Sequence, residues 1–293
     1  LDVPSIVLST LALGGLIYVF SSASTLGWGN AVVVDSIVVG VVALAWFIHR
    51  QLHIEEPLLQ LRALKTPTFA YSAVIVTVVN SALAVGSVIL PIYLQNVLGL
   101  TAFETGILMT PGAVATIFLS PVSGMLFDRF GPRVIAIVGL TGLTASLAAL
   151  SFVDDKTMVE YLVALYVIQS SGLTLANMPV TTWGINALPN DMIAHGNAIS
   201  NTGRQVGGAV STALIVTVMT MVTAANAEAG PVLSTAAGID VAYGISAAVA
   251  GIALVIAVLK VRNVKKQAVA SPASQAEAPL EIEMEEAREG AAR

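Results

Sequence analysis

The chain has 293 residues, of which 56% are hydrophobic and only 11% are charged. A soluble domain carries about 25% charged residues, so this composition excludes a soluble globular protein and indicates a membrane protein. The net charge is −5, but six acids and two bases lie in residues 277–293, so the rest of the chain is nearly neutral and no nucleic-acid partner is expected.

Eight stretches are long and apolar enough to cross a bilayer, which takes about 20 residues of helix. They are residues 5–23, 32–49, 68–94, 103–126, 133–152, 159–182, 198–222 and 238–260. The sequence therefore predicts an all-α membrane protein with eight transmembrane helices. Thr101-x-x-Glu104 is the pattern of a capping box and predicts the start of the fourth span. Residues 183–197 are expected to form a loop.

A charged island separates the fourth span from the fifth at residues 124–133. Gly131 and Pro132 disfavour a continuous helix, and Asp128, Arg129 and Arg133 cannot remain in hydrocarbon. The sequence therefore predicts that the chain leaves the bilayer here and re-enters at once.

The basic residues divide unevenly between the connections. Alternate connections hold Arg50, Arg62, Lys65, Arg129, Arg133 and Arg204, and the others hold Lys156 alone. Basic residues favour the cytoplasmic side of short loops, so both termini are expected in the cytoplasm. From residue 263 on, the composition predicts a disordered cytoplasmic tail.

The pattern G-x-x-x-D-R-x-G-x-R at residues 124–133 resembles the signature loop of the major facilitator superfamily. The matching residues are Gly124, Asp128, Arg129, Gly131 and Arg133. In that family the loop joins the second and third helices of a six-helix half. The resemblance implies that Asp128 and Arg129 latch neighbouring helices on the cytoplasmic side and act in the conformational switch.

Because two spans precede that half, the chain resembles the carboxy-terminal portion of the fourteen-helix drug:proton antiporter branch (EmrB/QacA-type). Segments 90–99, 105–112 and 197–208 agree. The resemblance implies a multidrug efflux transporter of the cell membrane, with small lipophilic or cationic substrates, proton as coupling ion, and an amino-terminal half that is missing from this chain. The expected parts are two extra helices (1–50), a cytoplasmic linker (51–67), the six-helix half (68–262) and the tail (263–293).

Polar residues inside the predicted spans are candidates for a substrate cavity, because lipid offers them no hydrogen-bond partner. They are Asn80, Gln169, Asn177, Thr181 and Asn201. Each could instead join helices through a hydrogen bond. The region around Asn177 and Thr181 adds Pro179, which frees a backbone carbonyl within the helix. Met109 and Met178 are read as gap fillers, and Gly139-x-x-Gly142 as a close helix contact.

Arg204 is a candidate gate, together with the adjacent Gln205. The reason is that Arg204 is a strong base that lies within a predicted span. It could pair with an acid in one conformational state, or its side chain could extend to the membrane interface. The acids Asp35, Glu104 and Glu160, with Asp240, fall near predicted outer helix ends. The sequence therefore predicts no carboxylate at the bilayer midplane, and the resemblance places the proton site in the amino-terminal half.

His49 and His53 have the spacing of a metal pair, but they lie at a basic helix end, which favours a solvated turn. Neither a metal nor a cofactor is expected. No G-x-S-x-G, H-E-x-x-H or P-loop pattern occurs, so an enzyme is not expected either. The alternative to a transporter is a non-transporting membrane remnant or an assembly partner.

Overall fold

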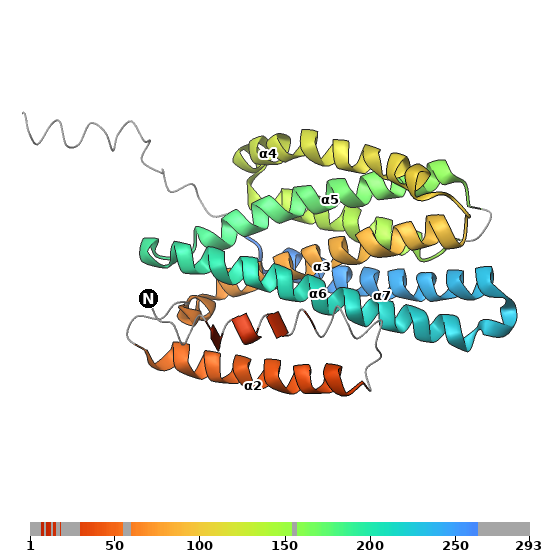
Figure 1. Ribbon diagram of the computed structural model, residues 1–293. Helices are drawn as coiled ribbons and strands as arrows, with labels where there is room; N and C mark the ends of the chain where they lie inside the picture. The colour runs from red at the N-terminus through yellow and green to blue at the C-terminus, as the bar shows by residue number, and fades with distance from the viewer. Residues whose placement is uncertain are drawn as a thin grey trace, which may run out of the picture. The chain divides into compact units, whose positions relative to one another are not determined.

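The computed structural model describes residues 30–54, 60–153 and 157–262, together with residues 7–8, 10–12, 14–15 and 18. Every element among them is helical (Figure 1). The long helices are α2 (Ala31–His53), α3 (Pro67–Asn96), α4 (Ala102–Leu150), α5 (Val159–Ile185), α6 (Ile193–Ala225) and α7 (Pro231–Lys260). The short 3-10 helices are η1 (Leu61–Lys65), η2 (Asn190–Met192) and η3 (Ala227–Ala229).

All six long helices have the length and hydropathy to cross a membrane, so the protein is an all-α membrane protein as predicted. By contact clustering, the chain forms two units, Leu1–Val261 and Arg262–Arg293. The long helices all belong to the first unit. The predicted tail (263–293) and most of the first predicted span (5–23) lie outside the described residues, so both remain predictions.

Local sequence signals set several helix starts. Asn30 caps α2, its side-chain oxygen accepting a 2.9 Å hydrogen bond from the backbone N–H of Val32. The predicted capping box is present at α4, where Glu104 accepts from Thr101 N at 2.8 Å and Thr101 Oγ1 accepts from Glu104 N at 3.3 Å. Pro231 begins α7 at a position where its missing N–H leaves no hydrogen bond unmade.

α4 holds both the fourth and the fifth predicted span, joined by a kink at Gly131. This residue has φ 79° and ψ 170°, a conformation that glycine adopts without the steric cost a Cβ would add. Pro132 follows and is buried. The predicted break within residues 124–133 is therefore confirmed.

The two arms of α4 lie on α5 and run in opposite directions. Contacts run from Gly112 to Tyr166 and from Gly124 to Met178 in the first arm, and from Gly139 to Ala176 and from Gly142 to Ile168 in the second. The first arm is thus parallel to α5 and the second antiparallel to it. α4 is a helical hairpin that closes around one side of α5.

The contact between the second arm and α5 is at backbone distance. A Cβ built on Gly139 would lie 2.6 Å from Ala176 N and 2.6 Å from Gly172 O. Real Cβ atoms do not approach other atoms so closely, so only glycine fits at this crossing. This agrees with the close packing expected of the Gly139-x-x-Gly142 pair.

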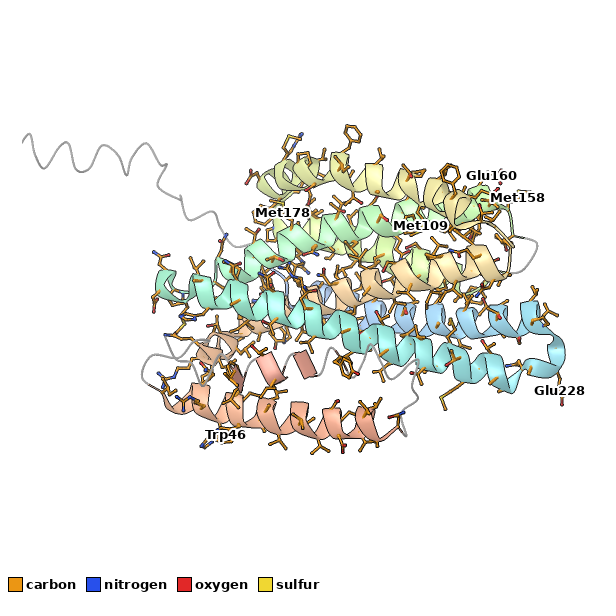
Figure 2. The ribbon with its side chains drawn as sticks, in the orientation of Figure 1. Trp46, Met109, Met158, Glu160, Met178 and Glu228 are labelled. Atoms are coloured by element: carbon orange, nitrogen blue, oxygen red, sulfur yellow. The ribbon has the colours of Figure 1, made fainter. Side chains whose placement is uncertain are left out.

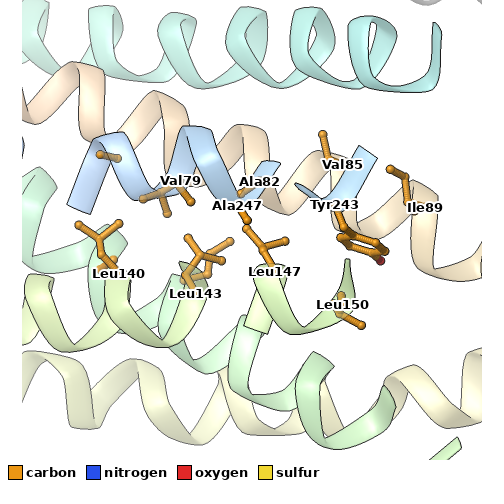
Figure 3. Close-up of a cluster of buried hydrophobic side chains, with 14 of the residues drawn as sticks. Val79, Ala82, Val85, Ile89, Leu140, Leu143, Leu147, Leu150, Tyr243 and Ala247 are labelled. Atoms are coloured by element: carbon orange, nitrogen blue, oxygen red, sulfur yellow. The ribbon is translucent and has the colours of Figure 1, made fainter. Parts of the chain in front are cut away.

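The core lies where the second arm of α4 meets α3 and α7 (Figure 3). Four leucines at helical spacing, Leu140, Leu143, Leu147 and Leu150, are fully buried on that arm. They face aliphatic residues of α3, together with Tyr243 and Ala247 of α7 (Figure 3). The core thus joins α3, α4 and α7, and α6 packs chiefly on α3 and α7.

Contacts place the start of α3, the turn of α4, the start of α6 and the end of α7 at one end of the bundle. Gln60 N donates to His195 Nδ1 at 3.4 Å, and the Lys260 ammonium lies 5.3 Å from the ring centre of Tyr71. This end carries Arg62, Lys65, Arg129, Arg133 and Lys260. Figure 2 shows Glu160 and Glu228 at the opposite end.

Two helices begin earlier than the hydropathy pattern predicted. α6 begins at Ile193, so the predicted 183–197 loop shortens to residues 186–192, and α7 begins at Pro231 rather than 238. The reason is that a spanning helix can extend past the hydrocarbon through residues that are only moderately apolar. Asp240 and Arg204 consequently lie deeper in their helices than expected.

Candidate functional site

A polar cavity of about 410 Å³ lies between α4, α5 and α6. Most of its wall comes from one face of α5. The lining residues are Thr116, Ser120, Leu173, Thr174, Asn177, Met178, Thr181, Thr182 and Arg204. Three of the predicted candidates, Asn177, Thr181 and Arg204, are therefore brought together.

Arg204 is the centre of a hydrogen-bond cluster in this cavity. Its Nη1 donates to Asn177 Oδ1 at 3.5 Å, and its Nη2 donates to Asn201 Oδ1, one turn earlier on α6. Asn177 Oδ1 also lies 3.4 Å from the hydroxyl of Thr181. The guanidinium thus links α5 to α6, two helices that otherwise share few contacts.

Three threonine hydroxyls of the cavity are bonded within their own helices. Thr116 Oγ1 donates to Gly112 O at 2.8 Å and Thr174 Oγ1 to Ser170 O at 2.9 Å. Thr181 Oγ1 donates to Asn177 O at 2.7 Å, close in sequence to Pro179. These bonds leave the methyl groups and hydroxyl lone pairs as the surface that a ligand would meet.

Arg204 lies three turns into α6, not in the first turns as predicted. It follows Ile193 by eleven residues, in a helix of 33 residues whose midpoint is residue 209. At 1.5 Å per residue, Arg204 lies about 17 Å along the helix axis from Ile193. This position, with both asparagine contacts, disfavours a side chain that merely extends to the interface.

Four other predicted residues do not line this cavity. Asn201 is exposed on α6 and is joined to the cavity through its hydrogen bond from Arg204. Asn80 donates to Val76 O of its own helix at 2.8 Å. This hydrogen bond joins no second helix, and Asn80 does not line the cavity. Gln169 is buried against Gly86 of α3, and its Oε1 has no hydrogen-bond partner among the described residues. Gln205 is exposed. Hydropathy alone could not tell which face of each helix these residues occupy.

Sequence reasoning missed Thr116 and Ser120, which contribute the α4 wall of the cavity. Their spacing of four residues on one helix face was the available signal. Met178 was read as a gap filler, but it lines the cavity with half of its side chain exposed. Met109 packs against the core as expected, and Figure 2 shows the two methionines well apart.

The residues of the signature loop lie on the exposed turn of α4. The Arg129 guanidinium lies 5.3 Å from the ring centre of Phe130, and Arg133 Nη2 donates to Val258 O at 3.1 Å. Asp128 is exposed, and within the described part of the chain it forms no ion pair. The latching role of Asp128 and Arg129 stays a prediction.

Asp240 lies farther into its helix than the sequence predicted. It is nine residues past Pro231, in a helix of 30 residues. Glu104 and Glu160 are in the first turns of their helices, and Asp35 is one turn into α2. Of these four acids, Asp240 is therefore the farthest from a helix end.

A second cavity, of about 320 Å³, lies between α3, α6 and α7 and is almost entirely apolar. Its wall includes Ser81 and Ser246, whose hydroxyls donate to carbonyls of their own helices at 2.9 and 2.8 Å. It carries no charged side chain. The polar chemistry of a substrate site is therefore found in the first cavity.

Comparison with known proteins supplies the family context. The sequence profile described as Major Facilitator Superfamily matches residues 5–212. The MFS-type transporter YcnB of Bacillus subtilis is 43% identical over 219 residues, which are 75% of this chain and 46% of that protein. These matches cover both the signature loop and the polar cavity.

Two further relatives are named lincomycin resistance protein LmrB. The protein of Listeria monocytogenes is 39% identical over 75% of this chain and 46% of its own length. The protein of Listeria innocua is 37% identical over 86% of this chain and 52% of its own length. The chain spans about half the length of the curated relatives that it matches.

Proposed function

This chain belongs to the major facilitator superfamily, and we propose that it is the carboxy-terminal portion of a fourteen-helix drug:proton antiporter. It is a membrane transporter rather than an enzyme. The proposal adds that it moves small lipophilic or cationic compounds out of the cell through the cell membrane. Similarity to two proteins named for lincomycin resistance supports a drug as the cargo.

The observation that carries this proposal is the polar cavity at Arg204. It combines a half-buried cation and amide groups with a helix that contains an internal proline, between helices long and apolar enough to span a membrane. Lipid would otherwise leave such polar groups unsatisfied. Transporters build substrate sites of this kind between helices near the bilayer midplane. Asn177, Thr181 and Asn201 are thus assigned to substrate binding, and Arg204 to the gate.

Alternating access requires two halves that move about a site between them. The six-helix half proposed for residues 68–262 supplies one wall of such a site, and the two helices proposed for residues 1–50 connect it to the amino-terminal half. Relatives that this chain matches over only 46% of their own length support that arrangement. Both termini of the chain are assigned to the cytoplasm from the distribution of basic residues.

Proton coupling requires a group whose protonation differs between the two conformations. We assign that role chiefly to carboxylates of the amino-terminal half. Within the described part of the chain, Asp240 is an acid nine residues inside a helix long enough to span a membrane, which makes it a candidate for a second such group. Asp240→Asn should therefore change the coupling only if this half contributes a second proton site.

Drug accumulation in cells carrying the full gene tests the proposal. Cells expressing the protein should accumulate less ethidium or lincomycin than control cells, and a proton uncoupler should abolish the difference. A membrane-inserted protein that leaves accumulation unchanged would instead support the alternative, a non-transporting remnant or assembly partner. Accumulation that falls equally with and without uncoupler would reject proton coupling but keep transport.

A further inference from the structure

We infer that the cavity at Arg204 binds an oxyanion of the transported compound, such as a carboxylate at one end of an otherwise apolar molecule. The inference rests on the proposed function, because it describes the same cavity, and it adds the charge of the cargo. It also departs from the cationic substrate class that the sequence left open, since it favours amphiphilic anions over cations.

The first argument is the unmatched charge of Arg204. Its guanidinium has five N–H donors, and its two hydrogen bonds go to the neutral amide oxygens of Asn177 and Asn201. None of the residues that line the cavity is an acid. Within the described chain, the cation therefore has dipoles as partners but no counter-charge.

The second argument is the direction of the hydrogen bonds around Asn177. Its Oδ1 faces both Arg204 Nη1 and the hydroxyl of Thr181. The carbonyl side of the amide is thus occupied, and its NH₂ group remains as a donor with no partner among the described residues. Together, the remaining guanidinium N–H groups and this amide form a donor-rich site, which suits a group with several lone pairs and negative charge.

The third argument is the place of Arg204 inside a helix long and apolar enough to span a membrane. A charge within such a helix is costly unless an opposite charge accompanies it. A cationic ligand in the same cavity would add repulsion, whereas an oxyanion would neutralise Arg204 and could form two parallel hydrogen bonds with it. Leu173 and Met178 line the cavity beside these donors, so they offer an apolar wall for the rest of the molecule.

Binding of three matched probes tests the inference. The protein purified from its full gene is placed in nanodiscs of zwitterionic lipid, and fluorescence anisotropy is measured with pyrenebutyrate, its methyl ester and pyrenebutyl-trimethylammonium. Empty nanodiscs correct for partition into lipid. The carboxylate should bind about tenfold more tightly than the ester, a ratio within the range of one charge-assisted interaction, and the cation should bind most weakly.

Two variants locate the effect. Arg204→Gln should remove the preference for the carboxylate, and Arg204→Lys should retain part of it. Asn177→Asp is nearly identical in size to the wild type and places a carboxylate where Asn177 Oδ1 now lies 3.5 Å from Arg204 Nη1. It should abolish carboxylate binding while the protein stays folded, because the intramolecular acid occupies the guanidinium.

Arg62→Gln serves as the matched control, because Arg62 is exposed in η1, outside the cavity. It should leave the preference unchanged. Equal affinity for all three probes in the wild type would overturn the inference. An equal loss for all three probes in Arg204→Gln, with a normal elution profile, would overturn it as well.

Failure of this inference and failure of the proposed function give different results. Uncoupler-sensitive efflux without a preference for the carboxylate would keep the transporter and reject the anion site. A preference that depends on Arg204, without efflux of any compound, would keep the site and reject the transporter.

Discussion

Arg133 Nη2 donates a 3.1 Å hydrogen bond to the backbone oxygen of Val258, which ties the turn of α4 to the last turn of α7. The carbonyls of a last helical turn have no partner within the helix and carry partial negative charge. Arg133, the last arginine of the signature loop, thus supplies a hydrogen-bond donor to a free carbonyl at the end of another helix. This gives Arg133 a structural role distinct from that of Asp128 and Arg129.

Replacing Arg133 should therefore lower stability. Arg133→Gln should reduce the free energy of unfolding by about 0.3–1 kcal/mol, the usual size of a cation effect at an exposed helix end. Arg133→Lys should recover most of this loss. Thermal unfolding in detergent measures the change, and identical curves for wild type and Arg133→Gln would show that the bond contributes nothing.

The crossing of α4 and α5 predicts a larger effect at Gly139. Gly139→Ala would force a Cβ to within 2.6 Å of two backbone atoms of α5, and should destabilise the protein by about 1–3 kcal/mol, as overpacking does.

Gly106→Ala is the matched control for Gly139, because a Cβ there meets no atom within 4 Å. It lies on the same helix and should be neutral or slightly stabilising. The measurement for both variants is the yield of folded protein and its unfolding temperature. Equal behaviour of the two would contradict the described crossing.

The signature loop should matter more for transport than for folding. Asp128 and Arg129 are both exposed, so Asp128→Asn and Arg129→Ala should leave the amount of membrane-inserted protein nearly unchanged. Transport should fall strongly in the full-length protein, because charges that change partners between conformations set the conformational equilibrium.

Asp191→Asn and Arg62→Ala are the controls for the loop, since both residues are exposed in 3-10 helices outside it. They should retain transport. If Asp128→Asn lost activity and inserted protein to the same extent, the loop would instead be a folding element.

The orientation of the chain can be tested by labelling, because the native chain contains no cysteine. Single cysteines at positions 24, 96 and 227 should react with an impermeant maleimide added outside the cell. Cysteines at positions 60 and 270 should not react until the membrane is opened. Asn96 and Ala227 are exposed at one end of the bundle, so opposite labelling of these two positions would contradict the topology.

Helix number and turns could be predicted from the sequence because their signals are local. Proline, glycine and charge together specified the break at Gly131, and Thr101 with Glu104 specified the start of α4. The direction in which each polar side chain lies could not be predicted, because these helices are apolar on nearly every face. Asn177 and Thr181 therefore reached the cavity as expected, whereas Asn80 bonds to its own helix.

The start of each helix was the other quantity that hydropathy misjudged. The pattern identified the most apolar part of α6 and α7 but not where each helix begins, so Arg204 and Asp240 were placed near the ends. Their positions, eleven residues past Ile193 and nine past Pro231, came from the structure. For these two ionisable residues, a shift of a few residues in the predicted helix start changes the functional interpretation.

The most direct test of the central claim is ethidium efflux from energised vesicles that contain either this chain alone or the product of the full gene. One half supplies one wall of the site, so the chain alone should insert but show no uncoupler-sensitive efflux, and the full product should restore it. Asp35→Asn, Glu104→Gln and Asp240→Asn serve as controls for a proton site within this half. Robust efflux by the chain alone that collapses with uncoupler would contradict the account, and its loss in one control would identify the carboxylate responsible.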